Sequence, residues 1–503
     1  MPISLSPSTL PVGVPRLDHG TRVVVFGATG YIGAHLVPRL LCEGREVRAC
    51  GRNRKVLEAR DWSGVESVEA DALMPDSLPA ALAGADTAYY LVHSMAAGRD
   101  FGRLDVQAAE NFAAAAEQAG VRRIVYLGGL VPDHADSEHL VSRRETGERL
   151  RAGRVPVTEI RAGIVVGPGS AAYEVVRDLV NHLPLMVTPR WVRSKSSPIA
   201  LENLLEYLVR AASLDEAAGK VLDAAGPDYI SYEEVMRQYG EVVGKRPRIF
   251  PVPVLTPELS ARWLGLITSV PTNIARALIG GLKHDLPADD AELRRLVPQQ
   301  LMTFRESVVA ALQAEQSQTV TARWSEGHLM FRGFQLDNAF YAKRASGSAV
   351  GTASASAVWH TVATVGGGNG YYSLDWLWWI RSVMDWLVGG PGLSRGRRHP
   401  TDLRLGDGID YWTVLALEPT RRLTLNFGMR APGAGALEFE VEPEDTSGDD
   451  RRTRLTITAY WHPQGVWGLL YWYALAPAHL FIFRRMSRAM LRRAEQCDAS
   501  ARG

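Results

Sequence analysis

The chain has 503 residues, of which 46% are hydrophobic and 22% charged, and its formal net charge is +1. At roughly 100–200 residues per domain, this length predicts two to four domains, each able to bury its own core. A balanced charge without a basic stripe gives no reason to expect a nucleic-acid partner. The three cysteines (Cys42, Cys50 and Cys497) form no CxxC pair, so we expect no disulfide framework and a cytoplasmic protein.

The first 20 residues are rich in Pro and Ser and lack a long apolar run, which predicts a flexible leader and no signal peptide. Residues 21–315 then alternate β-branched runs with helical stretches. The expected strands are 22–27, 46–50, 67–71, 87–92, 122–128 and 157–167. Strands that alternate with helices indicate an α/β fold, a doubly wound parallel sheet covered on both faces. We place its core at about 21–167 and a mostly helical substrate-side part at about 168–315.

A glycine-rich turn, GATGYIG, joins the first expected strand to a helical stretch. Glycines allow the backbone to approach a pyrophosphate, and the following helix N-terminus offers unpaired N–H groups. The order strand, turn, helix is the context that a dinucleotide site requires. The turn supplies the first cofactor-binding candidates, Gly27, Thr29, Gly30, Tyr31, Ile32 and Gly33.

The second expected strand ends in the basic sequence GRNRK, where an NAD site would carry Asp or Glu. Arg52 is placed to pair with a 2′-phosphate, with Arg54 or Lys55 assisting, so we predict NADP(H). The alternative is a solvated basic loop. The later strand ends add Asp71 and Ala72 on the adenine side, and Leu91, Val92 and His93 on the nicotinamide side.

The turn, Arg52 and the segment VRRIVYLGGL resemble the atypical, NmrA-like branch of the short-chain dehydrogenase/reductase superfamily. The resemblance covers about residues 20–315 and implies an extended or atypical Rossmann domain that binds NAD(P). It also covers RAGIVVGPGS, which resembles the segment that closes over the nicotinamide.

The family's catalytic Ser and Tyr-x-x-x-Lys set is replaced in this sequence. His139 takes the Tyr position, Arg143 the Lys position, and Gly128 or Gly129 the Ser position. Four residues separate His139 from Arg143, so both lie on one helix face. His139 could donate a proton and Arg143 could hold the nicotinamide ribose, with His93 as a competing proton donor. The alternative is that His139 contacts the cofactor without a chemical role.

We expect a linker at 316–335, a second domain at 336–495 and a tail at 496–503. Ten of the 13 tryptophans lie at or beyond Trp324. A strand, helices, several antiparallel strands and a long final helix predict an α+β domain that resembles the START-like (SRPBCC) helix-grip superfamily. The whole chain then resembles a bacterial two-domain group of unassigned function. Its tryptophans either fill a core or line a cavity for a small apolar or aromatic substrate. The cavity candidates are Trp376, Trp379, Trp386, Trp412, Trp461, Trp467 and Trp472, and the first five are the substrate-contact candidates.

The apolar stretch 466–483 has three interpretations: the buried final helix of that domain, a membrane-surface contact, or a spanning helix. Arginines that follow it would suit an anionic bilayer, so peripheral membrane contact through 466–493 stays open. We find no metal set, because His399, His462 and His479 have no companions at ligand spacing. The sequence specifies no oligomeric state.

These features predict an NADP(H)-dependent oxidoreductase that moves a hydride to or from an apolar carbonyl, enone or quinone-like substrate, which the second domain holds or covers. Two alternatives remain. One is a non-catalytic NADP(H)-binding sensor or assembly factor, which the missing Ser, Tyr and Lys favour. The other is a lipid-binding, membrane-peripheral protein in which the first domain is structural.

Overall fold

The structure is a computed structural model that describes residues 21–60, 62–93, 101–132, 137–252, 283–317, 320–322, 342–387, 401–444 and 452–502, with positions 267, 281, 397 and 399. The predicted leader and most of the predicted linker lie outside these residues. The chain divides into two compact units. They comprise Met1–Val180 with Pro184–Glu326, and Asn181–Leu183 with Gly327–Gly503. We call them the N-terminal and C-terminal domains.

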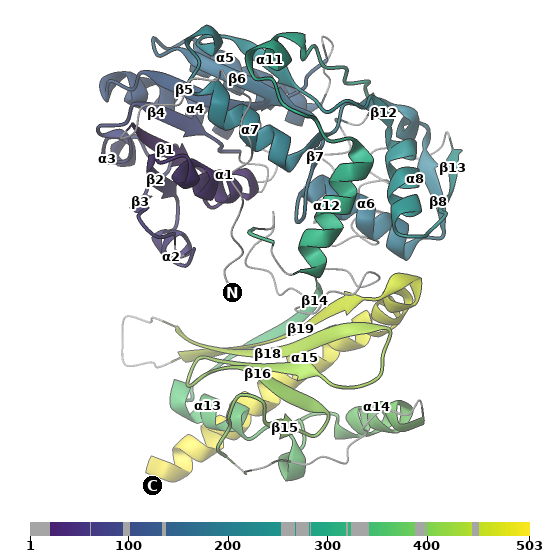
Figure 1. The fold of residues 1–503 in the computed structure, drawn as a ribbon. Coiled ribbons are helices and arrows are strands. Elements are labelled where there is room, and N and C mark those ends of the chain that lie inside the picture. The colour runs from purple at the N-terminus through teal and green to yellow at the C-terminus, as the bar shows by residue number, and fades with distance from the viewer. Residues whose placement is uncertain are drawn as a thin grey trace. The chain divides into compact units, whose positions relative to one another are not determined.

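The N-terminal domain is built on a seven-stranded sheet whose neighbouring strands are all parallel (Figure 1). The strand order is β11-β6-β5-β4-β1-β2-β3, so the order reverses between β1 and β4. This arrangement confirms the predicted doubly wound sheet. Its strands are β1 (Arg22–Phe26), β2 (Glu46–Gly51), β3 (Glu66–Glu69), β4 (Thr87–Tyr90), β5 (Arg123–Gly129), β6 (Val157–Ala162) and β11 (Val221–Ala224).

Each face of this sheet is covered by its own helices. Val23 and Val25 of β1 belong to a core shared with α1 (Tyr31–Cys42) and α7 (Leu201–Ala211). Val24 and Phe26 belong to the opposite core, shared with α3 (Leu78–Leu82), α4 (Phe101–Gln118) and α5 (Glu138–Arg151). Burial on both faces explains why the sequence of β1 is continuously apolar.

The remaining elements complete this domain, and most of them lie within residues 168–315. β8 and β13 make a separate parallel pair, and α12 begins with a capping box formed by Thr303 and Glu306. Helix α12 runs to Gln316, so it enters the predicted linker. The elements are α2 (Arg54–Glu58), β7 (Val165–Val166), α6 (Ala171–His182), β8 (Leu185–Pro189), β9 (Lys195–Ser196), β10 (Ile199–Ala200), β12 (Ile230–Ser231), α8 (Tyr232–Val242), β13 (Arg248–Val252), α11 (Ala291–Leu296) and α12 (Phe304–Gln316).

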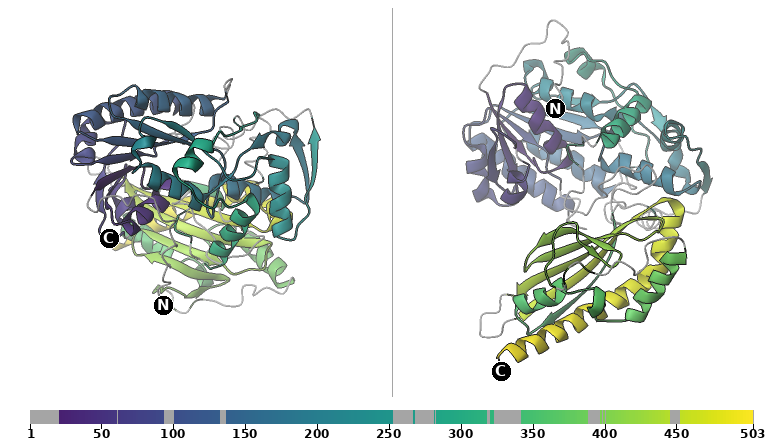
Figure 2. Two further views of the ribbon diagram at one scale, coloured as in Figure 1. Left: turned by 45° about the horizontal axis from the view of Figure 1, so that its top comes forward. Right: turned by 60° about the horizontal axis from the view of Figure 1, so that its bottom comes forward.

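The C-terminal domain wraps a six-stranded antiparallel sheet, in the order β14-β19-β18-β17-β16-β15, against a long final helix (Figure 2). Phe483, Met486 and Met490 of that helix are buried in the core of the domain. Over the described residues, the element order agrees with the predicted one: a strand, helices, several antiparallel strands and a long final helix. The elements are β14 (Lys343–Gly351), α13 (Ala355–Ala363), α14 (Asp375–Leu387), β15 (Gly408–Ile409), β16 (Trp412–Glu418), β17 (Arg422–Phe427), β18 (Gly433–Glu444), β19 (Arg452–Pro463) and α15 (Gly465–Arg502).

Gly347 allows α15 to approach the sheet closely. A Cβ at this position would lie 2.7 Å from the carbonyl carbon of Phe483. We expect Gly347→Ala to lower the free energy of unfolding by about 3 kcal/mol, because backbone on both sides leaves nothing flexible to move. Tryptophan fluorescence during urea unfolding measures this, with the exposed neighbour Ser348→Ala as control. Equal stability of the two variants would show that the helix shifts without penalty.

Candidate functional site

The glycine turn between β1 and α1 leaves room for a phosphate group. Gly27 has φ +93°, and a Cβ there would lie 3.0 Å from the main chain of Leu91. A Cβ at Gly33 would lie 2.8 Å from Ala28 Cα. The helix is preceded by Gly30, which makes no side-chain cap hydrogen bond, so no side chain occupies the N–H groups of the first turn. A pyrophosphate fits this turn, because its oxygens accept hydrogen bonds from free backbone N–H groups at the start of a helix.

Two arginines follow β2: Arg52 lies in the loop directly after it, and Arg60, just after α2, reaches the turn. Arg52 is exposed and directly follows Gly51, whose Cβ would lie 3.2 Å from the Thr29 side chain. Arg60 donates from Nη2 to the Thr29 carbonyl at 3.3 Å, and the sequence interpretation missed it. The predicted helper Arg54 instead pairs with Glu58 at 2.7 Å, which partly neutralises its charge.

The predicted adenine-side residues shape the turn after β3. Asp71 Oδ1 accepts a hydrogen bond from the Leu73 backbone N–H at 2.9 Å, and Ala72 is buried. On α1, the Tyr31 hydroxyl donates to the Pro168 carbonyl at 3.1 Å, while Ile32 packs against the core beside α1. These side chains therefore help to shape the walls of the site.

A chain of four polar side chains lies beyond the carboxyl end of β4. Asp105 of α4 is 2% exposed, and its Oδ2 accepts hydrogen bonds from the Ser142 hydroxyl at 2.9 Å and from His93 Nδ1 at 2.7 Å. His93 Nε2 lies 3.1 Å from His139 Nδ1. The structure thus brings the two predicted histidines together and adds Asp105 and Ser142, which the sequence interpretation did not select. We call these four residues the histidine relay.

The carboxylate of Asp105 fixes the protons on the two histidines of this relay. An ionised Asp105 can only accept, so His93 carries its proton on Nδ1 and presents a lone pair on Nε2. His139 then donates from Nδ1, and its own Nε2 keeps a lone pair for a substrate. Among the described residues, no hydrogen bond to that nitrogen is present.

Burial keeps both histidines neutral near pH 7. It lowers the pKa of His93, and the neighbouring Arg143 adds to this effect, although Asp105 acts in the opposite direction. Burial, with the nearby His93 and Arg143, lowers the pKa of His139 to about 3. A proton taken up by the relay would therefore be held weakly and passed on readily.

The same shifts predict how stability depends on pH. The pKa of folded His139 lies below its ordinary 6.5, so the unfolded chain binds more protons between these values and stability falls as pH drops from about 6.5 towards 3. Each such histidine contributes a slope of up to about 1.4 kcal/mol per pH unit. Urea unfolding between pH 7 and 5 measures the free energy of unfolding as a function of pH. This free energy should change less with pH in His139→Gln than in the wild type, whereas the control His360→Gln should keep the wild-type slope. Equal slopes for all three proteins would contradict the neutral relay.

Arg143 lies beside Gly129, which would place a Cβ 3.8 Å from Arg143 Nε. A Cβ at Gly128 would instead meet the buried carboxylate of Glu159 at 2.9 Å. Of the two glycines considered for the Ser position, Gly129 therefore faces the predicted ribose-binding arginine. Gly128 makes room for Glu159, which also pairs with Arg161 at 3.0 Å and with Arg151.

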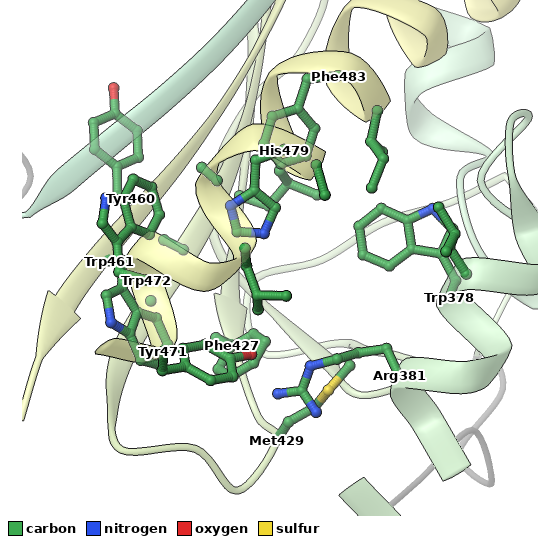
Figure 3. Close-up of a pocket in the computed structure, with 18 of the residues that line it drawn as sticks. Trp378, Arg381, Phe427, Met429, Tyr460, Trp461, Tyr471, Trp472, His479 and Phe483 are labelled. Atoms are coloured by element: carbon green, nitrogen blue, oxygen red, sulfur yellow. The ribbon is translucent and has the colours of Figure 1, made fainter. Parts of the chain in front are cut away.

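The C-terminal domain contains a cavity of about 220 Å³, lined mainly by apolar side chains of α14, the sheet and α15 (Figure 3). Three of the seven candidate tryptophans line it: Trp412, Trp461 and Trp472. The other four do not line this cavity and are exposed: Trp376 (59%), Trp379 (59%), Trp386 (68%) and Trp467 (72%). Trp378, which the sequence interpretation did not select, also lines it.

Within the described residues, no group of three or more His, Cys, Asp or Glu side chains could hold a metal ion. The N-terminal domain instead contains the glycine turn at residues 27–33, which we call the glycine cradle, and the histidine relay. They lie beyond the carboxyl ends of the adjacent strands β1 and β4. Dinucleotides bind at that edge in open α/β sheets, where the strand order reverses. The fold and the cradle thus define a dinucleotide-binding class of protein.

Comparisons with known proteins agree with this class. Residues 27–163 match a family described as NAD(P)H-binding, and residues 336–486 match a family described as a protein of unknown function (DUF2867). The chain is similar to the (4-alkanoyl-5-oxo-2,5-dihydrofuran-3-yl)methyl phosphate reductase of Streptomyces griseus, at 28% identity over 232 residues, 44% of this chain and 74% of that protein. It is also similar to the ceramide reductase of Caulobacter vibrioides, at 26% identity over 236 residues, 46% of this chain and 73% of that protein.

Among solved structures, the triphenylmethane reductase of Citrobacter sp. is 21% identical with a TM-score of 0.49, covering 58% of this chain and 99% of that one. A likeness of this size carries no information about activity. The family match confirms an NAD(P)H cofactor for the N-terminal domain, and the relatives place the chain among reductase-like, NAD(P)H-binding proteins. The match over the C-terminal domain assigns it no role.

Proposed function

We propose that this protein is an NADP(H)-dependent reductase of the atypical short-chain type, with an apolar carbonyl, enone or quinone-like substrate. The observation that carries the proposal is the histidine relay, Ser142–Asp105–His93–His139, joined by hydrogen bonds of 2.7 to 3.1 Å. A buried carboxylate that fixes the proton on a histidine is the arrangement that general acid–base catalysis uses. A protein that only senses the dinucleotide has no need of it.

The residues around the glycine turn have the chemistry to hold the cofactor. The turn would take the pyrophosphate, and Arg52, supported by Arg60, would pair with the 2′-phosphate of NADP(H). Arg143 would donate to the nicotinamide ribose, because arginine is a permanent donor and cannot act as a base. When bound, the cofactor supplies the hydride.

His139 is the proton-transferring residue in this proposal. Its Nε2 accepts the hydroxyl proton when the substrate is an alcohol. In reduction, a proton taken up from water passes through His139 Nε2 to the substrate oxygen, and His139 returns to its neutral form. The positive charge that forms is shared with His93 and stabilised by the carboxylate of Asp105. This replaces the tyrosine and lysine of the conventional family.

We propose further that the C-terminal domain is START-like and holds or covers the substrate. Its element order and its long helix against a curved antiparallel sheet support this role, as does the apolar cavity. Cavities with aromatic walls suit flat or greasy molecules.

Oxidation of NADPH, followed with a panel of quinones, enones and ketones, tests the reductase proposal. We expect turnover on at least one class, and a loss of about 100-fold or more in His139→Gln with NADPH affinity retained. Tight NADPH binding without turnover on any member would favour the alternative, a non-catalytic sensor. Unchanged turnover in His139→Gln would remove the relay from the mechanism.

A further inference from the structure

The apolar cavity of the C-terminal domain contains polar side chains whose hydrogen bonds are incomplete. Arg381 of α14 and His479 of α15 point into it from two helices (Figure 3). Within the part of the domain that the structure describes, Trp378 Nε1, Arg381 Nη2 and His479 Nδ1 are buried without a hydrogen-bond partner. Buried polar atoms in native proteins are nearly always paired, and two of these three nitrogens, on Trp378 and Arg381, are obligatory donors, so they indicate a missing partner with acceptor atoms.

The guanidinium of Arg381 gives the cavity one positively charged group. Arg381 lies over the rings of Phe427 and Tyr471, at 5.5 and 5.6 Å, and none of the lining residues that the structure describes is acidic. The acid one turn along α14, Asp385, accepts a hydrogen bond from the Arg430 backbone N–H at 2.7 Å. Burial and the charge of Arg381 lower the pKa of His479 to about 4, so the imidazole is neutral near pH 7.

We infer that this cavity binds a molecule with an apolar body and a single carboxylate, and that the carboxylate pairs with Arg381. A guanidinium and a carboxylate match in charge and geometry, so Arg381 is the group that selects the acid. The aromatic walls receive the apolar body. This inference deepens the proposed role of the C-terminal domain and rests on that role, but it does not depend on the reductase chemistry.

Binding of three probes with one chain length to the full-length protein tests the inference. Calorimetry with dodecanoate, dodecanol and dodecyltrimethylammonium separates charge from apolar contact. We expect dodecanoate to bind at least about tenfold more tightly than dodecanol, and the ammonium most weakly. Arg381→Met should remove the difference, Arg381→Lys should keep part of it, and the exposed control Arg421→Met should leave it unchanged.

The outcomes separate this inference from the role on which it rests. Equal affinities for acid and alcohol, or a preference that survives in Arg381→Met, would overturn the carboxylate assignment and leave an apolar-ligand domain. The absence of saturable binding by every probe would overturn the inference and the proposed role together. None of these results alters the NADPH oxidation test.

A second inference comes from the outer surface of the same domain. Large apolar side chains are exposed along one face of α14 and the first half of α15, in contrast to their usual burial. We call them the apolar surface: Trp376 (59% exposed), Trp379 (59%), Trp386 (68%), Leu387 (70%), Trp467 (72%), Leu470 (56%), Leu480 (56%) and Phe481 (59%).

The exposed face of α15 becomes basic where the apolar surface ends. Arg484, Arg485, Arg488 and Arg492 are exposed and follow Phe481 at spacings of three and four residues, so they continue the same stripe. By length and composition α15 could cross a membrane, but Phe483 and Met486 are buried in the domain core. We propose that the apolar surface and this arginine stripe bind the surface of an anionic lipid bilayer, where tryptophans favour the interface and arginines the headgroups.

Co-sedimentation with vesicles tests the membrane inference. The full-length protein should pellet with phosphatidylcholine vesicles containing phosphatidylglycerol, and at least about fivefold less with phosphatidylcholine alone. Trp376→Ser with Trp467→Ser should abolish pelleting, whereas Phe250→Ser, which changes an aromatic side chain that is 50% exposed in the N-terminal domain, should not. Pelleting by the double variant, or failure of the wild type to pellet, would overturn the inference. So would self-association of the wild type that the double variant abolishes, because the surface would then bind a second copy.

Discussion

Replacing Gly33 by valine should reduce the affinity for NADPH by more than about 100-fold, or about 2.7 kcal/mol. The Cβ of any other residue would lie 2.8 Å from Ala28 Cα and close to the Gly27 carbonyl, which are backbone atoms of the phosphate turn. To relieve this steric clash, α1 must move away from the turn. Its N-terminal N–H groups then no longer point toward the pyrophosphate. Fluorescence titration with NADPH measures the effect.

Two further variants test whether the loss of NADPH affinity comes from the phosphate turn itself. Gly30→Val is the alternative if Gly33→Val fails to fold, because Gly30 is exposed and its Cβ would lie 3.2 Å from its nearest neighbour. It should weaken NADPH binding by covering the same N–H groups. Gly408→Val, at a glycine with no atom within 4 Å of its Cβ, should leave the affinity unchanged. Wild-type affinity in both turn variants would place the dinucleotide elsewhere.

Asp105→Asn should lower the turnover of NADPH with an accepted substrate by about 10²- to 10⁴-fold, with NADPH affinity nearly unchanged. The substitution keeps the size of the side chain but removes the charge that stabilises a protonated His93–His139 pair. It also offers an N–H toward His93 Nδ1, which favours the wrong tautomer. Stopped-flow measurement of NADPH oxidation separates this effect from binding.

Ser142→Ala provides a graded comparison, because it removes the hydrogen bond that a neutral hydroxyl donates to the same carboxylate at 2.9 Å and leaves the charge of Asp105 in place. We expect a loss of only about fivefold, in line with one ordinary hydrogen bond. His360→Gln, on the exposed side of α13, should have no effect. Equal turnover in Asp105→Asn and wild type would show that the relay is structural.

The phosphate turn was predictable because its signal is local. A strand, the glycines of GATGYIG and a helix follow one another within a few residues, and each has the conformation its residue types favour. Arg52 could be selected because it directly follows β2. Arg60 could not, because its contact with Thr29 depends on how the chain folds back after α2.

The histidine relay was only half predictable. His93 and His139 could be selected because histidines are frequent proton donors and acceptors. The sequence pattern does not distinguish Asp105 from an ordinary polar residue on the exposed face of an amphipathic helix. Its burial follows from the packing of α4 beside α5, which joins residues 37 positions apart. A carboxylate at the start of an otherwise alanine-rich helical stretch was the available signal.

The tryptophans of α14 show a different limit. Composition indicates an aromatic-rich domain, but it does not tell which face of the helix meets the sheet. Trp376 and Trp379 lie three residues apart and share the outer face, while Trp378 and Arg381 share the inner one. The helical spacing separates these two sets, yet only the structure shows which set faces the cavity.

The most direct test of the central claim is the affinity of the full-length protein for NADPH and NADH, measured by calorimetry under identical salt. Pairing of Arg52 with the 2′-phosphate predicts that NADPH binds at least about tenfold more tightly, and that Arg52→Gln removes this advantage while leaving NADH unchanged. Equal or tighter binding of NADH to the wild-type protein would contradict the assignment of this site to NADP(H).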